Sequence, residues 1–243
     1  TERLAGAEGY DANVGRYYGE FINTAFGLMD LQTPRLDTRF MLCRPDGQWC
    51  LNPFACPHPA MFSLLNVRYN VLWPAVPLNS RHVTVKALND LVLVRDTEAL
   101  GRALFVRRAI PAGPKGALHE MTTGSFRPDR HVILAERPTL PPVPASDRVM
   151  TPTFELYGEH RISIELSTDT PGWLVLSDAW YPGWRVFVDG VERRTVRANH
   201  AFRAVALSRP GAHQVEWAYD PASVKVGAAL TLSALLFVMA LGV

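Results

Sequence analysis

The chain has 243 residues, of which 48% are apolar, and its 25 basic and 23 acidic residues leave a net charge of +2. This length suits one large domain or two ordinary ones, and this apolar fraction excludes a disordered chain. Basic and acidic residues are mixed along the sequence without a basic stripe, so we expect no nucleic-acid partner.

Residues 1–137 predict a mixed α/β subdomain. Apolar residues recur at helical spacing in Val14–Leu31, and two further short helices are expected at 60–66 and 115–123. Short apolar runs predict strands at 67–73, 91–96, 102–110 and 131–136.

Three cysteines, Cys43, Cys50 and Cys56, lie close together in a segment rich in proline and aspartate. A disulfide between two of them is the favoured interpretation and suits an oxidising compartment. Reduced, inert thiols and a metal site that includes His58 are the alternatives. The spacing C-x6-C-x5-C matches no compact zinc ligand pair, so we expect no metal.

Residues 138–152 predict an extended, proline-rich linker, because four prolines fall within Arg137–Asp147. Beyond it the apolar period changes to two, most clearly at Ile162, Ile164 and Leu166. Turn signals recur every eight to twelve residues, which predicts an antiparallel, jelly-roll-like β-sandwich of six to eight strands over 153–222. The expected class is α+β and mainly β.

The stretch SDAWYPGWRVFVDGVE, at 177–192, contains two turn signals. Pro182 and Gly183 suit the second and third positions of a type II turn, because proline fixes a negative φ and glycine accepts a positive one. Asp189 and Gly190 form the two-residue signal of a type I′ hairpin. Strand alternation then places Trp184 in the core.

Two further aromatic residues of this stretch, Trp180 and Tyr181, are candidates for glycan binding, since their flat apolar faces suit the C–H surface of a sugar. The alternative is an aromatic cluster that closes the end of the sandwich. Three nearby acidic residues, Asp178, Asp189 and Glu192, have the chemistry of a glycosidase acid/base pair. Turn and strand-surface roles are the stronger interpretation of these carboxylates.

The last eighteen residues, Val226–Val243, contain no charge. As a helix they extend about 27 Å, just short of the ~30 Å hydrocarbon core of a bilayer. They predict a transmembrane helix over 225–243 that is cut off near its far end, with Trp217 and Tyr219 as an aromatic belt at its start. A buried core helix is the alternative.

The run from Ser177 to Gly227, which reads SDAWYPGWRVFVDG and later RANHAFRAVALSRPG and YDPASVKVG, resembles the C-terminal end of the YfhO family of bacterial polytopic membrane proteins. Weaker similarity covers GYDANVGRYYGEFIN, LLNVRYNV, DTEALGRALFV and FRPDRHVILAE. Gly101 stands where that family usually has proline.

The resemblance implies a membrane glycosyltransferase of the multi-spanning GT-C type, which transfers sugar from a polyprenyl-phosphate carrier to a cell-surface glycopolymer. Its catalytic acidic residues are expected in an outer loop that lies outside this chain, so none is assigned here. Residues 1–225 would be a non-catalytic accessory region outside the cytoplasmic membrane of a bacterium. Upstream membrane helices, the bilayer, the glycopolymer and the carrier-linked sugar are the implied partners.

No cofactor is expected in this chain, and the larger protein would use none or a divalent cation. Two other functions remain open at this point. One is a structural or protein-interaction module without transferase activity. The other is an independent hydrolase that uses Asp178 or Glu192.

Overall fold

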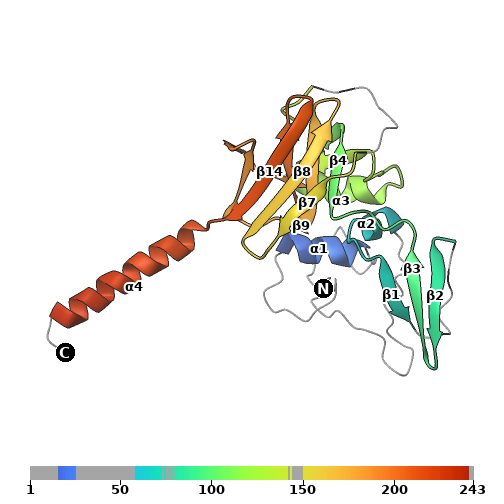
Figure 1. The fold of residues 1–243 in the computed structure, drawn as a ribbon, viewed down its shortest axis with the longest axis horizontal. Coiled ribbons are helices and arrows are strands. Elements are labelled where there is room, and N and C mark those ends of the chain that lie inside the picture. Colours follow the sequence, from blue (N-terminus) through green and yellow to red (C-terminus); the bar gives the residue numbers. More distant parts are fainter. Residues whose placement is uncertain are drawn as a thin grey trace.

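The computed structural model describes residues 16–25, 58–72, 74, 78, 80–141, 143 and 150–240. A sandwich of two β-sheets forms the body, with short helices beside it, a small projecting sheet and a long helix that leads away from it (Figure 1). The α+β, mainly β class expected from the sequence is confirmed. The helices are α1 (Arg16–Ala25), α2 (Pro59–Ser63), α3 (Gly113–Thr122) and α4 (Ala222–Ala240).

One sheet of the sandwich has five antiparallel strands in the order β11-β10-β14-β8-β7. These strands are β7 (Thr153–Tyr157), β8 (Arg161–Thr168), β10 (Trp184–Val188), β11 (Val191–Arg193) and β14 (Gly211–Tyr219). The period of two expected in β8 is present, with Ile162, Ile164 and Leu166 buried and Arg161 and Glu165 exposed. The apolar residues of this sheet therefore form one continuous inner face.

The other sheet has six strands in the order β4-β9-β13-β12-β6-β5, and only β5 and β6 run parallel. Its strands are β4 (Ala103–Val106), β5 (Arg108–Pro111), β6 (His131–Leu134), β9 (Gly172–Ala179), β12 (Val196–Ala198) and β13 (Phe202–Leu207). Strands from before and after residues 138–152 thus belong to one sheet. Residues 142 and 144–149 of the expected linker lie outside the described part of the chain.

The main core lies between these two sheets. Val186, Val215 and Trp217 of the five-stranded sheet pack against residues such as Leu174 and Val205 of the six-stranded sheet. A second apolar cluster joins α1, α2 and α3 to that sheet around Phe21, Met61, Leu118 and Phe202. The short helices therefore form part of the same body as the sandwich.

The prediction of a single strand at 102–110 is wrong, because this segment forms two strands, β4 and β5, at opposite edges of the six-stranded sheet. The chain breaks at Arg107, whose guanidinium donates to Asp169 Oδ1 at 2.9 Å and to Thr170 Oγ1 at 3.0 Å. These contacts hold Arg107 beside the loop between β8 and β9, outside the strand ladder.

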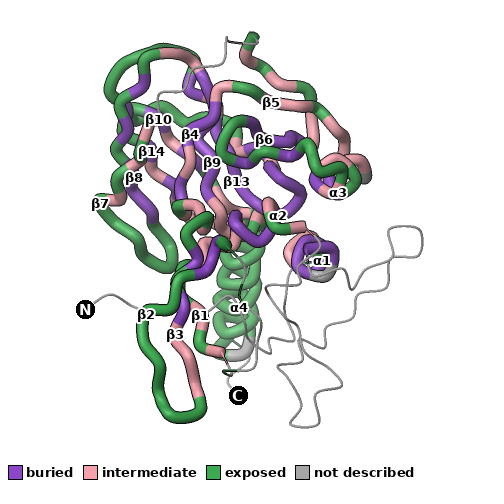
Figure 2. The backbone as a smooth tube through the Cα atoms, turned by 90° about the vertical axis from the view of Figure 1, so that its right-hand side faces the viewer, coloured by how far each residue is buried: buried purple, intermediate pink, exposed green. Residues whose placement is uncertain are grey.

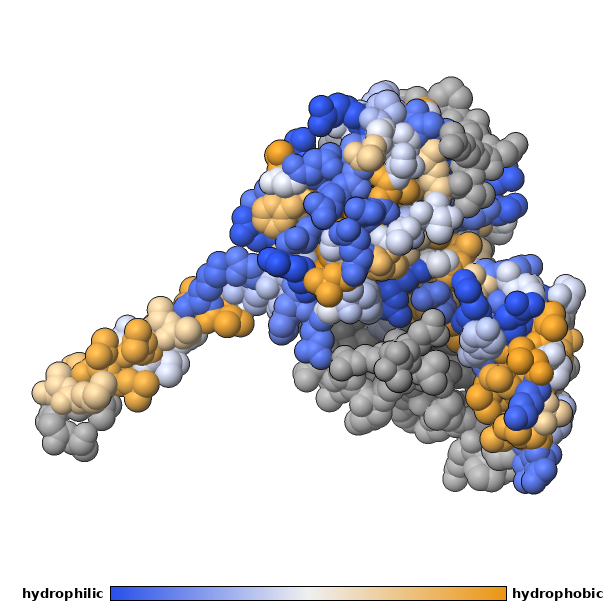
Figure 3. Space-filling model, viewed as in Figure 1, coloured by the Kyte–Doolittle hydropathy of each residue, from blue (hydrophilic) through white to orange (hydrophobic). Residues whose placement is uncertain are grey.

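The projecting sheet has the strand order β1-β3-β2, with β1 (Tyr69–Leu72), β2 (His82–Leu88) and β3 (Leu91–Asp96). A buried ion pair anchors it, in which Arg81 donates to both carboxylate oxygens of Asp96 at 2.8 and 2.6 Å. The same guanidinium donates to the Ser63 hydroxyl of α2 at 2.9 Å. Beyond this anchor much of the sheet surface is exposed and apolar, including Val71 and Val85 (Figures 2 and 3).

Only two residues separate β14 from the C-terminal helix α4, which is exposed along its length (Figure 2). Among the described residues, no helix meets the length and apolarity needed to cross a membrane. Trp217, expected in an aromatic belt beside this helix, is instead fully buried in the sandwich core, because its position on β14 faces inward. Tyr219 is half-buried at the end of that strand.

Gly172 at the start of β9 lies directly against the Phe105 ring of the neighbouring strand β4. A Cβ at this position would collide with the Phe105 ring and lie 2.9 Å from the Val106 carbonyl oxygen. We expect Gly172→Ala to lower the free energy of unfolding by about 1–3 kcal/mol, as overpacking does. Gly116→Ala in α3 is the matched control, since its Cβ has ordinary contacts and alanine favours a helix. Urea unfolding followed by tryptophan fluorescence measures both, and equal stabilities would contradict this account.

Candidate functional site

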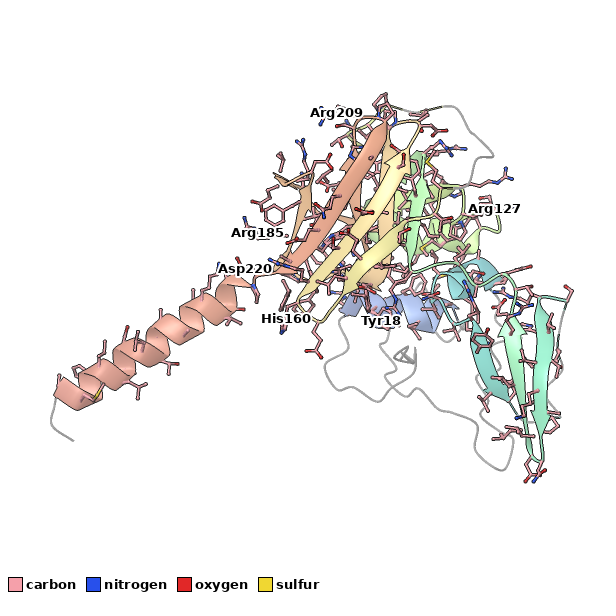
Figure 4. The ribbon with its side chains drawn as sticks, viewed as in Figure 1. Tyr18, Arg127, His160, Arg185, Arg209 and Asp220 are labelled. Atoms are coloured by element: carbon pink, nitrogen blue, oxygen red, sulfur yellow. The ribbon has the colours of Figure 1, made fainter. Side chains whose placement is uncertain are left out.

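The end of the sandwich from which α4 departs gathers most of the aromatic and charged residues that the sequence singled out. The turn before β10, the last residue of β14 and the ends of β7 and β9 meet there. Figure 4 shows His160 and Asp220 at this end and Arg209 at the opposite end.

The turn at Pro182 and Gly183 is tied to the start of α4. Gly183 has a φ of +105°, and a Cβ there would lie 2.9 Å from the Pro221 side chain. Its carbonyl accepts the backbone N–H of Asp220 at 2.8 Å. Glycine is thus required by both conformation and space. The next turn, between β10 and β11, has φ values of +53° at Asp189 and +77° at Gly190, which suit a type I′ hairpin.

Trp184 is half-buried and packs against the sandwich core. Its ring lies 3.9 Å from the guanidinium carbon of Arg203, which reaches it from β13. The centroid of the same ring is 5.2 Å from that of Tyr219. The indole therefore joins the two sheets at this end and also supports the strand that leads into α4.

Asp178 and Arg203 form the buried centre of a polar cluster, to which the partly exposed Arg102 and the exposed Tyr157 also belong. Its carboxylate accepts from Arg102 and Arg203, both at 2.9 Å, and from the Tyr157 hydroxyl at 3.1 Å. Burial lowers the pKa of Arg203 to about 10, against the opposing effect of Asp178. Burial, reinforced by Asp178, raises the pKa of Tyr157. Two guanidinium groups share one carboxylate, so the cluster has a net positive charge.

Trp180 and Tyr181, the candidate glycan-binding residues, have different surroundings. Trp180 is half-buried, its backbone N–H donates to the Ala201 carbonyl at 2.6 Å, and its ring meets Tyr17 of α1 edge-on with 6.0 Å between the centroids. Tyr181 is 54% exposed. Of the two, Tyr181 offers the more accessible ring, while Trp180 contributes to the packing of α1.

A second buried polar pair, which sequence reasoning missed, joins α1 to the β12–β13 turn. His200 Nε2 lies 2.7 Å from Glu20 Oε2, and Arg16 Nε donates to Glu20 Oε1 at 2.7 Å. Burial lowers the pKa of His200 despite the opposing Glu20 carboxylate. His200 and the preceding Asn199 have φ values of +65° and +44°, so this turn is held in a strained conformation. Nothing in the local sequence pairs this histidine with a residue so distant in the chain.

The three acidic residues considered for glycosidase chemistry are not brought together. Asp178 belongs to the buried cluster, Asp189 accepts from His213 and the Gln214 N–H, and Glu192 pairs with Arg185 at 2.6 Å. Each carboxylate is thus engaged by a different partner. Within the described residues no group of His, Cys, Asp and Glu is placed to hold a metal ion. Cys43, Cys50 and Cys56 lie outside those residues.

Comparison with protein-family models, curated proteins and solved structures finds no match. The resemblance to the YfhO family therefore stays a prediction.

The shared carboxylate makes Asp178 the most sensitive position of the buried cluster. We expect Asp178→Asn to lower the free energy of unfolding by about 3–5 kcal/mol, because it leaves two guanidinium groups without their counter-charge. Glu192→Gln, which breaks an exposed pair with Arg185, is the control and should change the free energy of unfolding far less, because solvent screens this pair. Similar losses for both variants in urea unfolding would show that Asp178 does not hold this end together.

The Glu20–His200 pair predicts a dependence of stability on pH. The folded chain binds the His200 proton less readily than the unfolded chain, whose histidine pKa is near the ordinary 6.5. Unfolding therefore takes up a proton, and stability should be full above about pH 6.5 and decline as the pH falls below it. His200→Gln should reduce this slope without abolishing it, because burial also lowers the pKa of His82 and His131.

The matched control for this titration is His119→Gln, on an exposed position of α3. Melting temperatures measured from pH 8 to pH 5 should fall with the wild-type slope in the control and less steeply in His200→Gln. A wild-type slope in both variants would show that His200 does not cause the pH dependence of stability.

Proposed function

We propose that this chain is the extracytoplasmic accessory region of a bacterial membrane glycosyltransferase, held at the bilayer by α4. The observation that carries the proposal is the exposure of α4. Eight large apolar side chains of this helix are 55–66% exposed: Val224, Val226, Leu230, Leu232, Leu235, Leu236, Phe237 and Met239. At 100° per residue they spread over about 240° of the helix circumference, and small residues such as Gly227, Thr231 and Ala234 lie in the remaining sector. Apolar surroundings therefore suit most of the helix surface.

The polar residues near α4 support an interfacial position for its first turn. Lys225 Nζ lies 2.6 Å from Asp220 Oδ2, and Arg185 reaches the same oxygen at 3.4 Å. After Lys225 the helix contains no charged residue. Figure 3 shows the corresponding change from hydrophilic to hydrophobic along the helix. Charged groups at the start and apolar groups beyond are the pattern of a helix that enters lipid from water.

The transferase part of the proposal rests on the sequence resemblance. On that basis the sandwich would lie over the membrane-embedded site and engage the acceptor glycopolymer or the carrier-linked sugar. A tether this short keeps the domain at the membrane surface, where a high effective concentration makes weak sugar contacts useful. Tyr181, exposed at the same end of the sandwich as α4, supports such a contact.

A second candidate function is a protein-interaction module, and the projecting sheet favours it. Tyr69 and Val71 of β1 and Val83 and Val85 of β2 are 45–63% exposed. An apolar surface on an element that extends from the body is typical of a partner-binding site. This function predicts lipid attachment through α4 without any sugar affinity.

Lipid attachment is testable with the whole chain. We expect it to float with vesicles of phosphatidylethanolamine and phosphatidylglycerol in a density gradient. Leu230→Lys combined with Leu236→Lys should prevent flotation, because each lysine costs about 3 kcal/mol in a membrane-embedded helix. Leu156→Lys, at an exposed position of β7, is the matched control and should float normally. Flotation of the double variant would contradict an anchoring role for α4.

Transfer itself is testable in the larger protein, by incorporation of labelled sugar into the cell-surface polymer. Tyr181→Ala should reduce the rate about fivefold, which corresponds to an aromatic contact of about 1 kcal/mol. Trp180→Ala is expected to have a similar effect on transfer, with a further loss of stability from its contact with Tyr17. Normal transfer by both variants would remove this aromatic pair from acceptor binding.

A further inference from the structure

The outer face of the five-stranded sheet has a hollow of about 480 Å³ near the start of α4. Its polar rim comes from three adjacent strands and the α4 connection and includes Arg161, Arg185, Gln214, Glu216 and Asp220. Figure 4 shows Arg185 and Asp220 close to one another at the root of the helix. This volume lies within the range of small-molecule sites, about 300–1,000 Å³.

Strand register explains why the surface is hollow here. Ala218 of β14 pairs with Arg185 of β10 on one side and with Arg161 of β8 on the other. A methyl group thus lies between two long side chains, which leaves space above the alanine. Two residues before Ala218, on the same face of β14, Glu216 pairs with Phe187 of β10. The half-buried Phe187 ring provides the apolar part of the lining, and the guanidinium carbon of Arg185 lies 5.3 Å from its centroid.

The charges of the hollow are already paired. Arg161 lies 3.2 Å from Glu216, while Arg185 contacts Glu192 at 2.6 Å and Asp220 at 3.4 Å. The two cations and two anions of the lining, Arg161, Arg185, Glu216 and Asp220, therefore sum to zero. A phosphate or carboxylate ligand would have to displace a carboxylate from its arginine. An uncharged ligand meets no such cost.

The exposed edges of these ion pairs retain hydrogen-bonding capacity. A guanidinium has five N–H donors and a carboxylate has about four acceptor positions, more than these pairs use. Adjacent hydroxyls of a sugar can donate to Glu216 and accept from Arg161 at the same time. The amide of Gln214 adds one further donor and acceptor at the rim. An uncharged sugar offers this alternation of polar hydroxyls and an apolar C–H face.

From this combination we infer that the hollow, hereafter the outer-face groove, binds an uncharged sugar segment of a glycan. Phe187 serves as the apolar platform, Glu216 and Arg161 bind the hydroxyls, and Ala218 leaves the space for the ring. This sugar site deepens the proposed function. It rests on that function for the biological role of the glycan and for the position of the groove at the membrane surface. It moves the principal sugar contact from the turn aromatics to the sheet face.

Saturation-transfer NMR on the whole chain in phosphatidylcholine nanodiscs tests the groove, because this medium contains no sugar detergent. The probes are maltotriose and N,N′,N″-triacetylchitotriose, with trigalacturonate as the anionic comparison. We expect at least one neutral trisaccharide to bind with a Kd below about 10 mM and more tightly than the anion. Absence of binding by both neutral probes, or tighter binding of trigalacturonate, overturns the inference.

Two alanines on the outer face of β14 provide a matched pair of variants. Ala218→Leu fills the hollow, whereas Ala212→Leu places the same side chain beyond it, where Ala212 pairs with Ser167. Ala218→Leu should weaken binding by about tenfold or more, and Phe187→Ala should do the same, while Ala212→Leu binds like the wild type. Wild-type affinity in Ala218→Leu would contradict the assignment of the groove as the sugar site.

Two comparisons separate this inference from the proposed function. If Tyr181→Ala abolishes trisaccharide binding and Ala218→Leu does not, the turn is the sugar site, so the groove fails and the proposed function stands. If the wild-type chain does not float with vesicles but Ala218→Leu still abolishes sugar binding, the membrane role fails and the groove stands.

Discussion

The burial of Trp217 between the two sheets determines how the rest of the molecule is arranged. Because side chains alternate along a strand, an inward Trp217 and Val215 require Glu216 and Ala218 to face outward. The same alternation thus builds the core and the outer-face groove. A shift of one residue in the pairing of β14 would turn the Trp217 indole toward water and Glu216 toward the core, so the register of this strand is strongly specified.

The helix-bearing end of the sandwich is closed by polar contacts instead of aliphatic packing. Asp178 neutralises one of two guanidinium groups, and the Trp184 ring covers the other side of Arg203. Such clusters contribute little net stability compared with apolar packing. Removal of one member is nevertheless strongly destabilising, because it leaves a buried charge without its partner. They also fix geometry, because guanidinium and carboxylate meet in a defined orientation. This end therefore holds Gly183 and Tyr219 in fixed positions beside the connection to α4.

The sequence was sufficient for features that depend on local order. The alternation of apolar and polar residues identified the inward face of β8. The glycines at 183 and 190 likewise indicated turns, and both adopt positive φ values. Strand pairing between distant segments has no such local signal. The membership of β4, β5 and β6 in the six-stranded sheet was therefore not predicted. Neither was the division of 102–110 into two edge strands, which depends on contacts of Arg107 with a loop beyond β8.

The same distinction applies to the candidate sites. The aromatic residues near Trp180 attracted attention because they are neighbours in the chain, whereas Asp178 and its two arginines come from three separate strand ends. Trp217 was assigned to a membrane belt from its distance to the apolar helix, although the register of β14 turns it into the core. A single residue, Asp220, connects the Gly183 turn, the start of α4 and Arg185. Its N–H holds the Gly183 turn, and its carboxylate contacts both Lys225 of α4 and Arg185 of the groove. A change in the direction of α4 would alter the contact between Lys225 and Asp220, and Arg185 shares that carboxylate, so the pairing of Arg185 depends on how the helix leaves the sandwich.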